Sequence, residues 1–419
     1  MTGILAGIKV VEFAQNAAVP YCGRLLAGMG ADVVKVEPPE GDAMRSLAQL
    51  APNEGKAYAV INPGKRAITL DLGAGDAVTV VQALCAWADV VLVGVKQSDL
   101  ARYGIDDVSA RAINPRLIHL THTPFGPEGP DADVGGYDVL VQGRSGAGYI
   151  MNRTEKGVPI STRPAVNDFG TGIASALGVV AALRHRDLTG EGQRVDASLL
   201  GTALALATPL VNFFETIDLE PLSQLDEDLQ LLRAAGVSFE EQREVYEQRV
   251  IPGAGAFRLS FRHYATADGL ISIAGLSPGL VRRFHEITGL ALPDRSDPYG
   301  ADFNAVVEAA DALFRTKTSA EWMTTLREAG YPCAPYNTPF EAVRDEQIRA
   351  NDFIIDLEHP TFGSYSASGE PIRFSAAPAE RVGPSPSLGQ HTREVLAEIG
   401  LDATAIDQLV TDGVVTAPS

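Results

Sequence analysis

Apolar and polar positions alternate along the first half of the chain in short blocks of two kinds. Runs rich in β-branched residues, at 8–14 and 31–37, are typical of buried strands, and the stretch between them, 21–30, has helical spacing and ends at Gly30. The same alternation continues through four further segments, 67–72, 77–88, 89–95 and 116–126. This order predicts an α/β fold with a mostly parallel, Rossmann-like sheet covered by helices.

Loops that follow the predicted strands are candidates for ligand binding. Ligands of open parallel sheets collect at the carboxyl ends of the strands, and the loops 37–42 and 93–99 lie at two such ends. The first strand–helix–strand unit lacks the G-x-G-x-x-G pattern that cradles a dinucleotide. We therefore expect a ligand at this edge that is not held in the manner of a classical dinucleotide.

The pattern changes after residue 204, which predicts a second, smaller domain. Residues 205–250 are acidic with helical spacing, as expected of a linker region. The Asp268–Gly269 pair is a strong hairpin signal inside a predicted α+β domain at 251–330. The large α/β domain is expected at 1–204, and mixed signals resume in a C-terminal part at 331–419.

Composition narrows the class of protein. The 419 residues include 45% hydrophobic residues, and the net charge of −19 is spread through the chain, which argues against nucleic acid or an anionic membrane as a partner. We see no charged leader before an apolar segment and no apolar run of about 18 residues, so we expect a cytoplasmic protein. The three cysteines, Cys22, Cys85 and Cys333, are too widely spaced to indicate a disulfide or a metal site.

One acid stands at the start of a long apolar stretch. Asp168 precedes a predicted helix that carries no further acid until Asp187 and stops at Gly190. A short acidic side chain in this place can cap the helix by accepting N–H groups that the first turn leaves unpaired. It can equally be a reactive carboxylate, and this segment alone does not decide between the two roles.

Several motifs, in order and nearly end to end, resemble one enzyme family. They lie at 7–42, 62–72, 114–130, 135–146, 171–193, 359–378 and 388–400. In these motifs the chain is similar to the class III coenzyme A transferases, the formyl-CoA and carnitine-CoA transferase family of CaiB/BaiF-like proteins. The resemblance is weakest at 205–250 and in the predicted small domain, which are the regions expected to shape the acyl pocket.

The resemblance implies a reaction and a nucleophile. The family's nucleophilic aspartate matches Asp168, which implies transfer of CoA from an acyl-CoA to a free carboxylic acid through a covalent aspartyl-CoA intermediate. The helix N-terminus would stabilise the carboxylate, and N–H groups around Gly170 to Gly172 would stabilise the oxyanion. Coenzyme A enters as a substrate, and no permanently bound cofactor or metal is implied.

The family's coenzyme contacts carry over by position. They fall on Asn16, Ala17, Pro38, Leu70, Asp71, Leu72, Gly73, Gly94, Val95, Lys96, Arg102, Tyr137 and Asp138. Formyl-CoA transferase has glutamine, arginine and lysine where this chain has Ala17, Pro38 and Gly73, and an asparagine–phenylalanine pair at Gly94–Val95. The amide missing at Ala17 argues against oxalate or formate as substrate. Arg102 is the best retained cation, and Lys65, Arg66 and Lys96 are further candidates to face the phosphates.

Two other functions compete with transfer. The α-methylacyl-CoA racemases resemble these transferases but pair the aspartate with a histidine where this chain has Tyr137, and a phenol, with a pKa near 10, is a poor proton carrier near neutrality. We interpret His119 and His122, on the preceding strand, as packing or hydrogen-bonding residues. The third possibility is a non-catalytic acyl-CoA-binding protein, and the presence of Asp168 in its motif argues against it.

The resemblance also implies an assembly. The family forms dimers in which each chain is a ring threaded by the other, with both chain ends in the large domain. The helical stretch 205–250 and the return of family motifs after residue 330 fit this path, so we expect an interlocked homodimer. The acyl donor and acceptor are not identified by the sequence.

Overall fold

The computed structural model describes residues 2–250, 257–293, 298–378 and 382–417. The chain divides into two compact units, one formed by Met1–Thr216 with Arg349–Ser419 and the other by Ile217–Ile348. The chain therefore leaves the first unit once and later returns to it. Residues 251–256, where the predicted small domain begins, lie outside the described residues.

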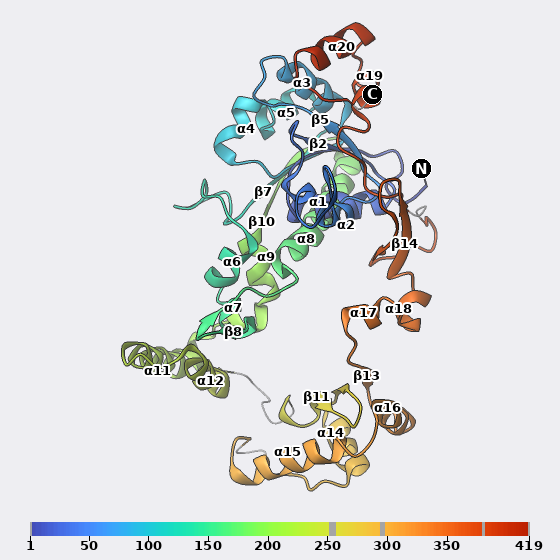
Figure 1. Cartoon of the computed structure of the whole chain (residues 1–419). Coiled ribbons are helices and arrows are strands. Elements are labelled where there is room, and N and C mark those ends of the chain that lie inside the picture. The colour runs from blue at the N-terminus through green and yellow to red at the C-terminus, as the bar shows by residue number, and fades with distance from the viewer. Residues whose placement is uncertain (1, 251–256, 294–297, 379–381, 418–419) are drawn as a thin grey trace. The chain divides into compact units, whose positions relative to one another are not determined.

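A six-stranded parallel sheet forms the centre of the first unit (Figure 1). Its strand order is β10-β7-β6-β1-β2-β5, and every neighbouring pair is parallel. The strands are β1 (Lys9–Phe13), β2 (Asp32–Glu37), β5 (Arg66–Thr69), β6 (Val90–Val93), β7 (Ile118–Thr123) and β10 (Gln193–Ser198). The predicted α/β fold with a mostly parallel sheet is confirmed.

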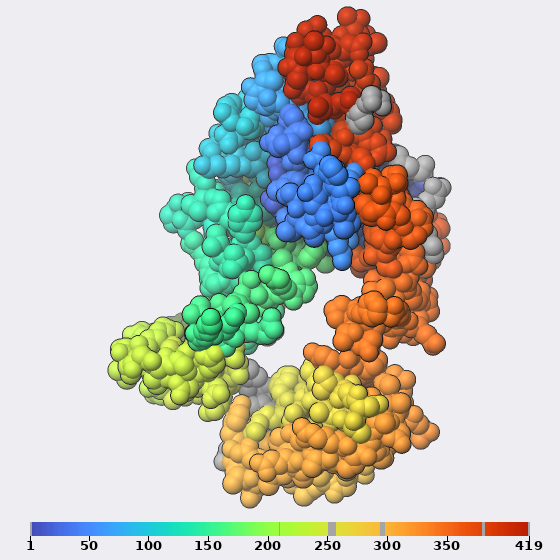
Figure 2. Space-filling model, in the orientation of Figure 1, coloured from blue at the N-terminus to red at the C-terminus, as the bar shows by residue number. Residues whose placement is uncertain are grey.

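Helices cover both faces of this sheet because most of its strands are apolar on both sides. Val10 belongs to a buried cluster with α1 (Ala18–Gly28) and α8 (Val166–Thr189), whereas its neighbour Val11 belongs to a second cluster on the opposite face. The second cluster contains α3 (Ala77–Trp87) and the C-terminal helices α19 (Thr392–Glu398) and α20 (Ala403–Thr411). In the space-filling view the red C-terminal atoms accordingly lie against blue atoms of the first hundred residues (Figure 2).

The remaining elements of the first unit are short. The helices are η1 (Ala43–Arg45), α2 (Lys56–Ile61), α4 (Gln97–Tyr103), α5 (Asp107–Ile113), α6 (Asp138–Arg144), α7 (Ala147–Met151), α9 (Leu199–Leu206) and α10 (Thr208–Val211). Three antiparallel hairpins pair β3 (Gln49–Ala51) with β4 (Glu54–Gly55), β8 (Thr154–Glu155) with β9 (Val158–Pro159), and β14 (Ile354–His359) with β15 (Gly363–Ser368).

Helix α8 packs closely on its neighbours because it carries glycines where they touch. A side chain at Gly172 would come within 2.8 Å of the Ala18 carbonyl oxygen, and one at Gly170 within 2.9 Å of Leu206. The helix ends at the predicted Gly190, which adopts a left-handed conformation with φ of 83°. Among the described helices it alone is long and apolar enough to span a membrane by length and composition. By length and composition, the expectation that the chain has no apolar run of about 18 residues is therefore wrong. Nearly half of the most apolar part of α8 is nevertheless buried in the protein, as in a core helix.

The second unit is a small α+β structure. Its sheet has the order β11-β12-β13, and β11 and β12 form the antiparallel hairpin predicted from the Asp268–Gly269 pair. Its elements are α12 (Phe239–Val250), β11 (Phe261–Ala265), β12 (Leu270–Ala274), α14 (Pro278–Thr288), α15 (Ala301–Phe314), α16 (Ser319–Glu328), β13 (Cys333–Pro335) and α17 (Pro339–Ala342). Two helices, α11 (Glu215–Ala234) and α18 (Glu346–Ala350), cross the limits between the units.

Candidate active site

Two cavities adjoin at the carboxyl ends of the central strands of the parallel sheet. Along the chain, β2 and β5 are added on one side of β1, and β6, β7 and β10 on the other. The strand order therefore reverses between β1 and β6, and such a reversal leaves a crevice where ligands bind. The four residues that line both cavities, Gln15, Asn16, Gly94 and Val95, come from the loops after these two strands.

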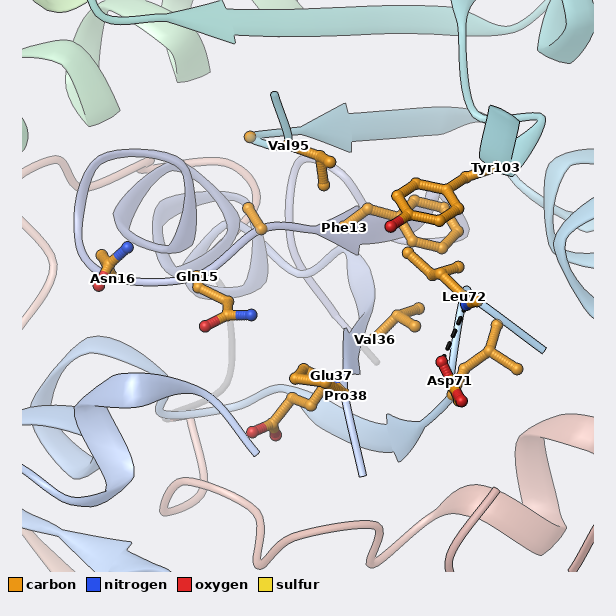
Figure 3. A pocket seen from close by; sticks show the side chains of 14 residues that line it. Phe13, Gln15, Asn16, Val36, Glu37, Pro38, Asp71, Leu72, Val95 and Tyr103 are labelled. Carbon is orange, nitrogen blue, oxygen red and sulfur yellow. Dashed lines mark hydrogen bonds between the residues drawn. The ribbon is translucent and has the colours of Figure 1, made fainter. Parts of the chain in front are cut away.

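Cavity 1 has a volume of about 350 Å³ and lies over the ends of β1, β2, β5 and β6. Figure 3 shows Phe13, Leu72 and Tyr103 gathered at one side, where they pack with the apolar core. The polar side chains of Gln15 and Asn16 lie at the other side. The remaining lining residues are Ala14, Val36, Glu37, Pro38, Leu70, Asp71, Gly73, Gly94 and Val95. This cavity can accept a partly apolar ligand.

Cavity 2 has a volume of about 290 Å³ and contains Asp168. It extends over the ends of β1, β6 and β7 and is closed by the loop before α6. Its lining residues are Gln15 to Val19, Gly94 to Gln97, His122 to Pro124, Ala132 to Tyr137, Asp168 and Leu199. The two cavities adjoin at the four residues that line both of them.

Eleven of the thirteen predicted coenzyme contacts line one or both cavities. The two others lie outside the linings. Asp138 is buried at the start of α6, and Arg102 is exposed, with its guanidinium near the Tyr103 hydroxyl and 3.4 Å from the carboxylate of Asp99. Lys96 is the one basic side chain among the described residues that line the cavities.

Gly94 lies where the loops after β1 and β6 come close together. A β-carbon at this position would lie 3.0 Å from the Ala14 β-carbon and 3.3 Å from a methyl group of Val19. A larger residue at Gly94 would therefore need its neighbours to shift by a few tenths of an ångström. At this point the wall between the cavities is made of backbone and small side chains.

Asp168 does not cap its helix. Helix α8 begins at Val166, its N-cap residue is Ala165, and Asp168 lies in the first turn. No N–H group of the helix donates to the Asp168 carboxylate, and in the described part of the chain this side chain has neither a hydrogen bond nor an ion pair. The capping interpretation is therefore wrong, and the carboxylate is available to a ligand in cavity 2.

The environment of Asp168 disfavours its charged form. Burial raises its pKa from 3.8 to about 6, and the nearby carboxylate of Asp138 contributes to the same rise. Asp138 is held in place because it accepts hydrogen bonds from the backbone N–H of Asn167, at 2.9 Å, and from the side chain of Gln142. A pKa of about 6 leaves most Asp168 side chains ionised at pH 7, and the carboxylate is more basic than an exposed one.

The N–H groups that were expected to stabilise an oxyanion are used within α8. The first intrahelical bond runs from Phe169 N–H to the Ala165 carbonyl, so Gly170 to Gly172 lie past the turn whose N–H groups stay unpaired. A different helix end is available. In α1 the first intrahelical donor is Tyr21, and Ala17, Ala18 and Val19, which precede it, line cavity 2.

Two cations expected to face phosphates are occupied elsewhere. Lys65 is buried, and its ammonium donates to the Glu12 carboxylate at 2.8 Å and the Pro20 carbonyl at 2.7 Å. Arg66 pairs with Asp32 at 2.7 Å and with Glu394 and Glu398 on α19. The prediction that Lys65 and Arg66 face the phosphates is wrong. The sequence does not show which acids lie opposite these two side chains in the fold.

A buried ionic network supports the loop between the cavities. Lys35, on β2, donates to Glu12 at 3.0 Å and to the Ala14 carbonyl at 2.5 Å, and it pairs with Asp42 at 2.9 Å. Asp42 in turn accepts the backbone N–H of Asn16 at 3.2 Å. Although burial opposes the ammonium charge, Glu12 and Asp42 raise the pKa of Lys35. The network thus fixes Asn16 in a left-handed conformation, with φ of 69°, at the shared wall.

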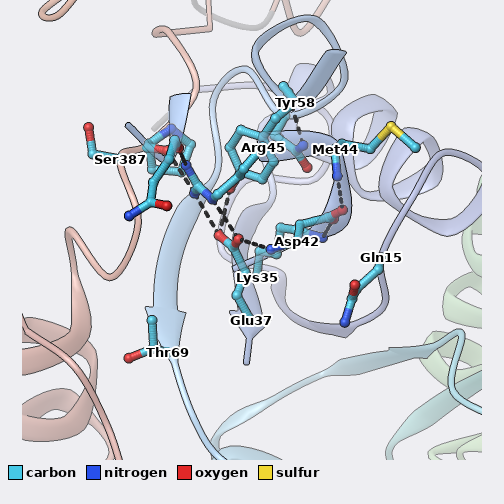
Figure 4. A network of polar contacts seen from close by, with 12 residues as sticks. Gln15, Lys35, Glu37, Asp42, Met44, Arg45, Tyr58, Thr69 and Ser387 are labelled. Carbon is cyan, nitrogen blue, oxygen red and sulfur yellow. Dashed lines mark hydrogen bonds and ion pairs between the residues drawn. The ribbon is translucent and has the colours of Figure 1, made fainter. Parts of the chain in front are cut away.

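The ionic network also includes Glu37, at the end of β2. Figure 4 shows the Glu37 carboxylate between Arg45, Asp42 and Tyr58. Arg45 donates to it twice, each time at 2.7 Å, and the Tyr58 hydroxyl donates at 2.8 Å. Since Glu37 ends β2 and also lines cavity 1, this bonding holds the loop that carries Pro38.

The two histidines of β7 have different surroundings. His119 is buried, and its ring contacts the Ile105 carbonyl at 2.8 Å and the Thr121 hydroxyl at 3.2 Å, so its interpretation as a hydrogen-bonding core residue is confirmed. His122 lines cavity 2, and neither of its ring nitrogens has a hydrogen-bond partner in the described residues. Three residues that line cavity 2 were not predicted as site residues from the sequence: His122, Gln97 and Gln15. The strand-end positions of His122 and Gln15 were the signal that could have shown them.

The described side chains form no cluster that indicates a metal site. Within the described ranges no three His, Cys, Asp or Glu side chains come together in a way that could hold a metal ion. Cys22 and Cys85 are buried, and burial raises the pKa of both thiols. Neither cysteine lines the cavities.

Comparison with known proteins gives a consistent assignment. Residues 5–392 match the model of CoA-transferase family III. The chain is 33% identical over 410 residues to a succinate–glutarate CoA-transferase from Agrobacterium fabrum, covering 94% of this chain and 95% of that protein. It is 31% identical to a formyl-CoA:oxalate CoA-transferase from Rhodopseudomonas palustris, covering 95% and 94%. A CaiB/BaiF family protein from Brucella suis has a similar structure, with a TM-score of 0.72 at 28% identity, over 95% of this chain and 100% of that one.

Proposed function

The chain belongs to CoA-transferase family III. We propose that it moves CoA between carboxylic acids through a covalent intermediate on Asp168. It is a class III CoA-transferase, and the acyl-CoA and the free acid are its substrates. The observation that carries the proposal is Asp168 itself. Its carboxylate is partly buried, has no hydrogen bond to the described part of the chain and lines the cavity next to the candidate coenzyme site.

The proposed reaction has two half-reactions that mirror each other. A carboxylate oxygen of Asp168 attacks the thioester carbonyl carbon, the carbon–sulfur bond breaks, and a mixed anhydride and CoA thiolate form. The thiolate attacks the Asp168 carbonyl of the anhydride, which releases the first acid as a carboxylate and leaves aspartyl-CoA. The acceptor carboxylate then attacks this thioester, and the returning thiolate takes the new acyl group. Asp168 is regenerated, and no proton is gained or lost overall.

The geometry supports each requirement of this chemistry. A nucleophile must be ionised, and a pKa of about 6 keeps Asp168 largely charged at pH 7. The tetrahedral intermediates need hydrogen-bond donors, and the unpaired N–H groups at the start of α1, at Ala17 to Val19, line the same cavity. Donors at the start of a helix also carry the positive end of its dipole, which favours an oxyanion.

The coenzyme is proposed to occupy cavity 1 and reach Asp168 across the wall shared with cavity 2. The apolar side around Leu72 and Tyr103 suits an aromatic base, and Asn16, Val95 and Lys96 line the path toward Asp168. Arg102 is exposed beside Tyr103, so it is positioned to meet a phosphate outside the cavity. We propose that the enzyme works in the cytoplasm without a permanently bound cofactor.

Replacement of Asp168 by Asn tests the nucleophile. The neutral amide cannot form the anhydride, so the variant should lose exchange of labelled CoA between two acyl groups while it stays folded. Asp133→Asn is the matched control, since Asp133 lines the same cavity and should keep most of the activity. Full exchange by Asp168→Asn, after mass analysis has excluded deamidation to Asp, would show that Asp168 is not the nucleophile.

A racemase of the same fold is the alternative that one observation favours. His122 places an imidazole in the cavity of Asp168, whereas Tyr137 occupies the position of the racemase histidine. Burial lowers the pKa of His122 to about 4, which is low for a base that removes a proton from carbon. A transferase should take up no solvent deuterium at the α-carbon of a 2-methylacyl-CoA. Rapid uptake without a change of acyl group would favour the racemase.

We propose further that the enzyme is an interlocked homodimer. The chain leaves its first unit at Thr216 and returns at Arg349, as a ring-shaped subunit requires. Helix α8 also exposes the apolar side chains Ile173 and Leu177, the second of them 71% exposed, which a partner chain would cover. Interlocked rings do not separate on dilution, so sedimentation at nanomolar concentration should show a dimer. A folded monomer at this concentration would contradict the proposal.

A further inference from the structure

Two polar side chains in cavity 2 have a buried nitrogen that no described residue pairs. They are Nε2 of Gln97, at the start of α4, and Nε2 of His122, at the end of β7. Both residues line the cavity together with Asp168. Buried polar groups in folded proteins are nearly always paired, so a polar side chain left without partners at a cavity is a candidate to bind a ligand through its accessible atoms.

The imidazole of His122 can offer a hydrogen-bond donor to the cavity. Its Nδ1 also has no partner among the described residues, and unlike Nε2 it is not shielded from solvent. Burial lowers the pKa of the ring to about 4, so it is neutral at pH 7 and carries one proton. An unpaired buried N–H is rarer in proteins than an unpaired acceptor, which favours the tautomer with the proton on the accessible Nδ1. A ligand in the cavity then meets an N–H group.

We propose that His122 donates a hydrogen bond to an uncharged oxygen on the acyl group, and that the preferred substrates are carboxylic acids bearing a hydroxyl or carbonyl group. This inference rests on the proposed transferase function and specifies its substrate class. Gln97 lines the same cavity, but its amide nitrogen is buried, so the accessible donor is that of His122. His122 is thus a specificity-determining residue rather than a nucleophile or a base.

The lining of the cavity favours an uncharged oxygen over a second carboxylate. Its acidic side chains are Asp133 and Asp168, and its one basic side chain among the described lining residues is Lys96. A dicarboxylic acid would bring its extra negative charge into a cavity with a surplus of acids, and a neutral imidazole offers no charge to balance it. A hydroxyl or carbonyl group accepts the same hydrogen bond without this repulsion.

A plain hydrocarbon acyl group would fit this cavity less well. It would cover the N–H of His122, remove it from water and give it no partner. The same N–H pairs with a substituent oxygen when the acid carries one. Sites that hydrogen-bond a substrate group discriminate against analogues without it for this reason.

The first test compares acceptors of equal length on the wild-type protein. Butyrate, 3-hydroxybutyrate, 3-oxobutyrate and succinate are offered singly with a common acyl-CoA donor, and kcat/KM is measured for each by mass spectrometry of the products. The hydroxy and oxo acids should exceed both butyrate and succinate by about ten-fold, the size of one hydrogen bond to a neutral group. Equal values, or a preference for butyrate or succinate, would overturn the inference.

The second test removes the donor. His122→Phe keeps an aromatic ring without N–H, and it should reduce kcat/KM for the oxygen-bearing acids to the level of butyrate, mainly through KM. His122→Gln retains a donor and should recover part of the difference. His185→Phe, the same change at an exposed site on α8, should leave the ratios unaltered. An equal loss for all four acids in His122→Phe would assign a structural role to His122 and overturn its role in specificity.

The two proposals fail in different ways. If Asp168 is not the nucleophile, no aspartyl adduct forms in any variant, whatever the order of the acceptors. If only the role of His122 is wrong, the adduct forms in His122→Phe as in the wild type, and the ratio of the oxygen-bearing acids to butyrate does not change. Adduct formation by His122→Phe also reports that this variant is folded.

Discussion

Replacing Asp168 by Asn should make the protein more stable at pH 8 while abolishing its activity. The folded-state pKa of Asp168, about 6, lies above the ordinary value of 3.8, so the folded protein binds this proton more tightly than the unfolded chain does. The ionised carboxylate therefore destabilises the folded state, and this cost is complete above about pH 7. It disappears as the pH falls from about 6 toward 4.

The size of the effect follows from the pKa. A rise of about two pH units corresponds to about 3 kcal/mol in the free energy of unfolding. Because Asp168 is only partly buried, solvent screening reduces this figure to about 1–2 kcal/mol. The helix dipole acts in the opposite direction, since a negative charge in the first turn of α8 contributes about 0.3–1 kcal/mol of stability. We expect a net gain of about 1 kcal/mol for Asp168→Asn at pH 8.

Thermal unfolding measured from pH 4 to pH 8 tests this prediction. A gain of about 1 kcal/mol raises the Tm by about 2–4 °C at pH 8 for a domain of this size. The difference between variant and wild type should shrink below pH 6 and be nearly absent at pH 4. Asp133→Asn, at an exposed acid of the same cavity, should leave the Tm unchanged at both pH values. An unchanged or lower Tm for Asp168→Asn at pH 8 would show that the ionised carboxylate does not destabilise the folded protein.

Three further predictions concern the neighbours of the site. Asp138→Asn should move the acidic limb of the pH profile of kcat/KM to lower pH, by less than about one pH unit because burial is the larger cause of the raised pKa of Asp168, and Asp133→Asn should not move it. Arg102→Ala should raise the KM for the CoA donor with a smaller change in kcat, and an unaltered KM would place the phosphates elsewhere. Lys35→Met leaves Glu12 and Asp42 buried without their cation, so denaturant unfolding should show a loss of about 3–5 kcal/mol, against little change for the exposed Lys56→Met.

The sheet and the strand-end site could be predicted because both follow from local patterns. The β-branched runs around Val10 and Val33 mark strands that are buried on both faces, and helices between parallel strands leave the loops at one edge. The position of Asp168 at a helix start was also visible in the sequence. Its lack of a capping bond was not, because the helix begins three residues earlier than the apolar pattern indicates.

The ionic network could not be predicted, because its partners are distant in the sequence. Lys65 pairs with Glu12, 53 residues away, and Arg66 pairs with Glu398, 332 residues away. Lysine and arginine beside a predicted ligand edge therefore have two possible partners, phosphate or protein carboxylate. His122 presents the opposite case, since a strand histidine is usually paired and only the fold shows that this one is not.

Trapping of the aspartyl intermediate shows directly whether Asp168 is the nucleophile. The wild-type protein is incubated with a labelled acyl-CoA, quenched with hydroxylamine and digested, and the peptide 164–172 is analysed by mass spectrometry. The account predicts a hydroxamate on Asp168 that requires the acyl-CoA and is absent from Asp168→Asn. Transfer of CoA between acids with Asp168 unmodified, or with the hydroxamate on another residue, would contradict this role of Asp168.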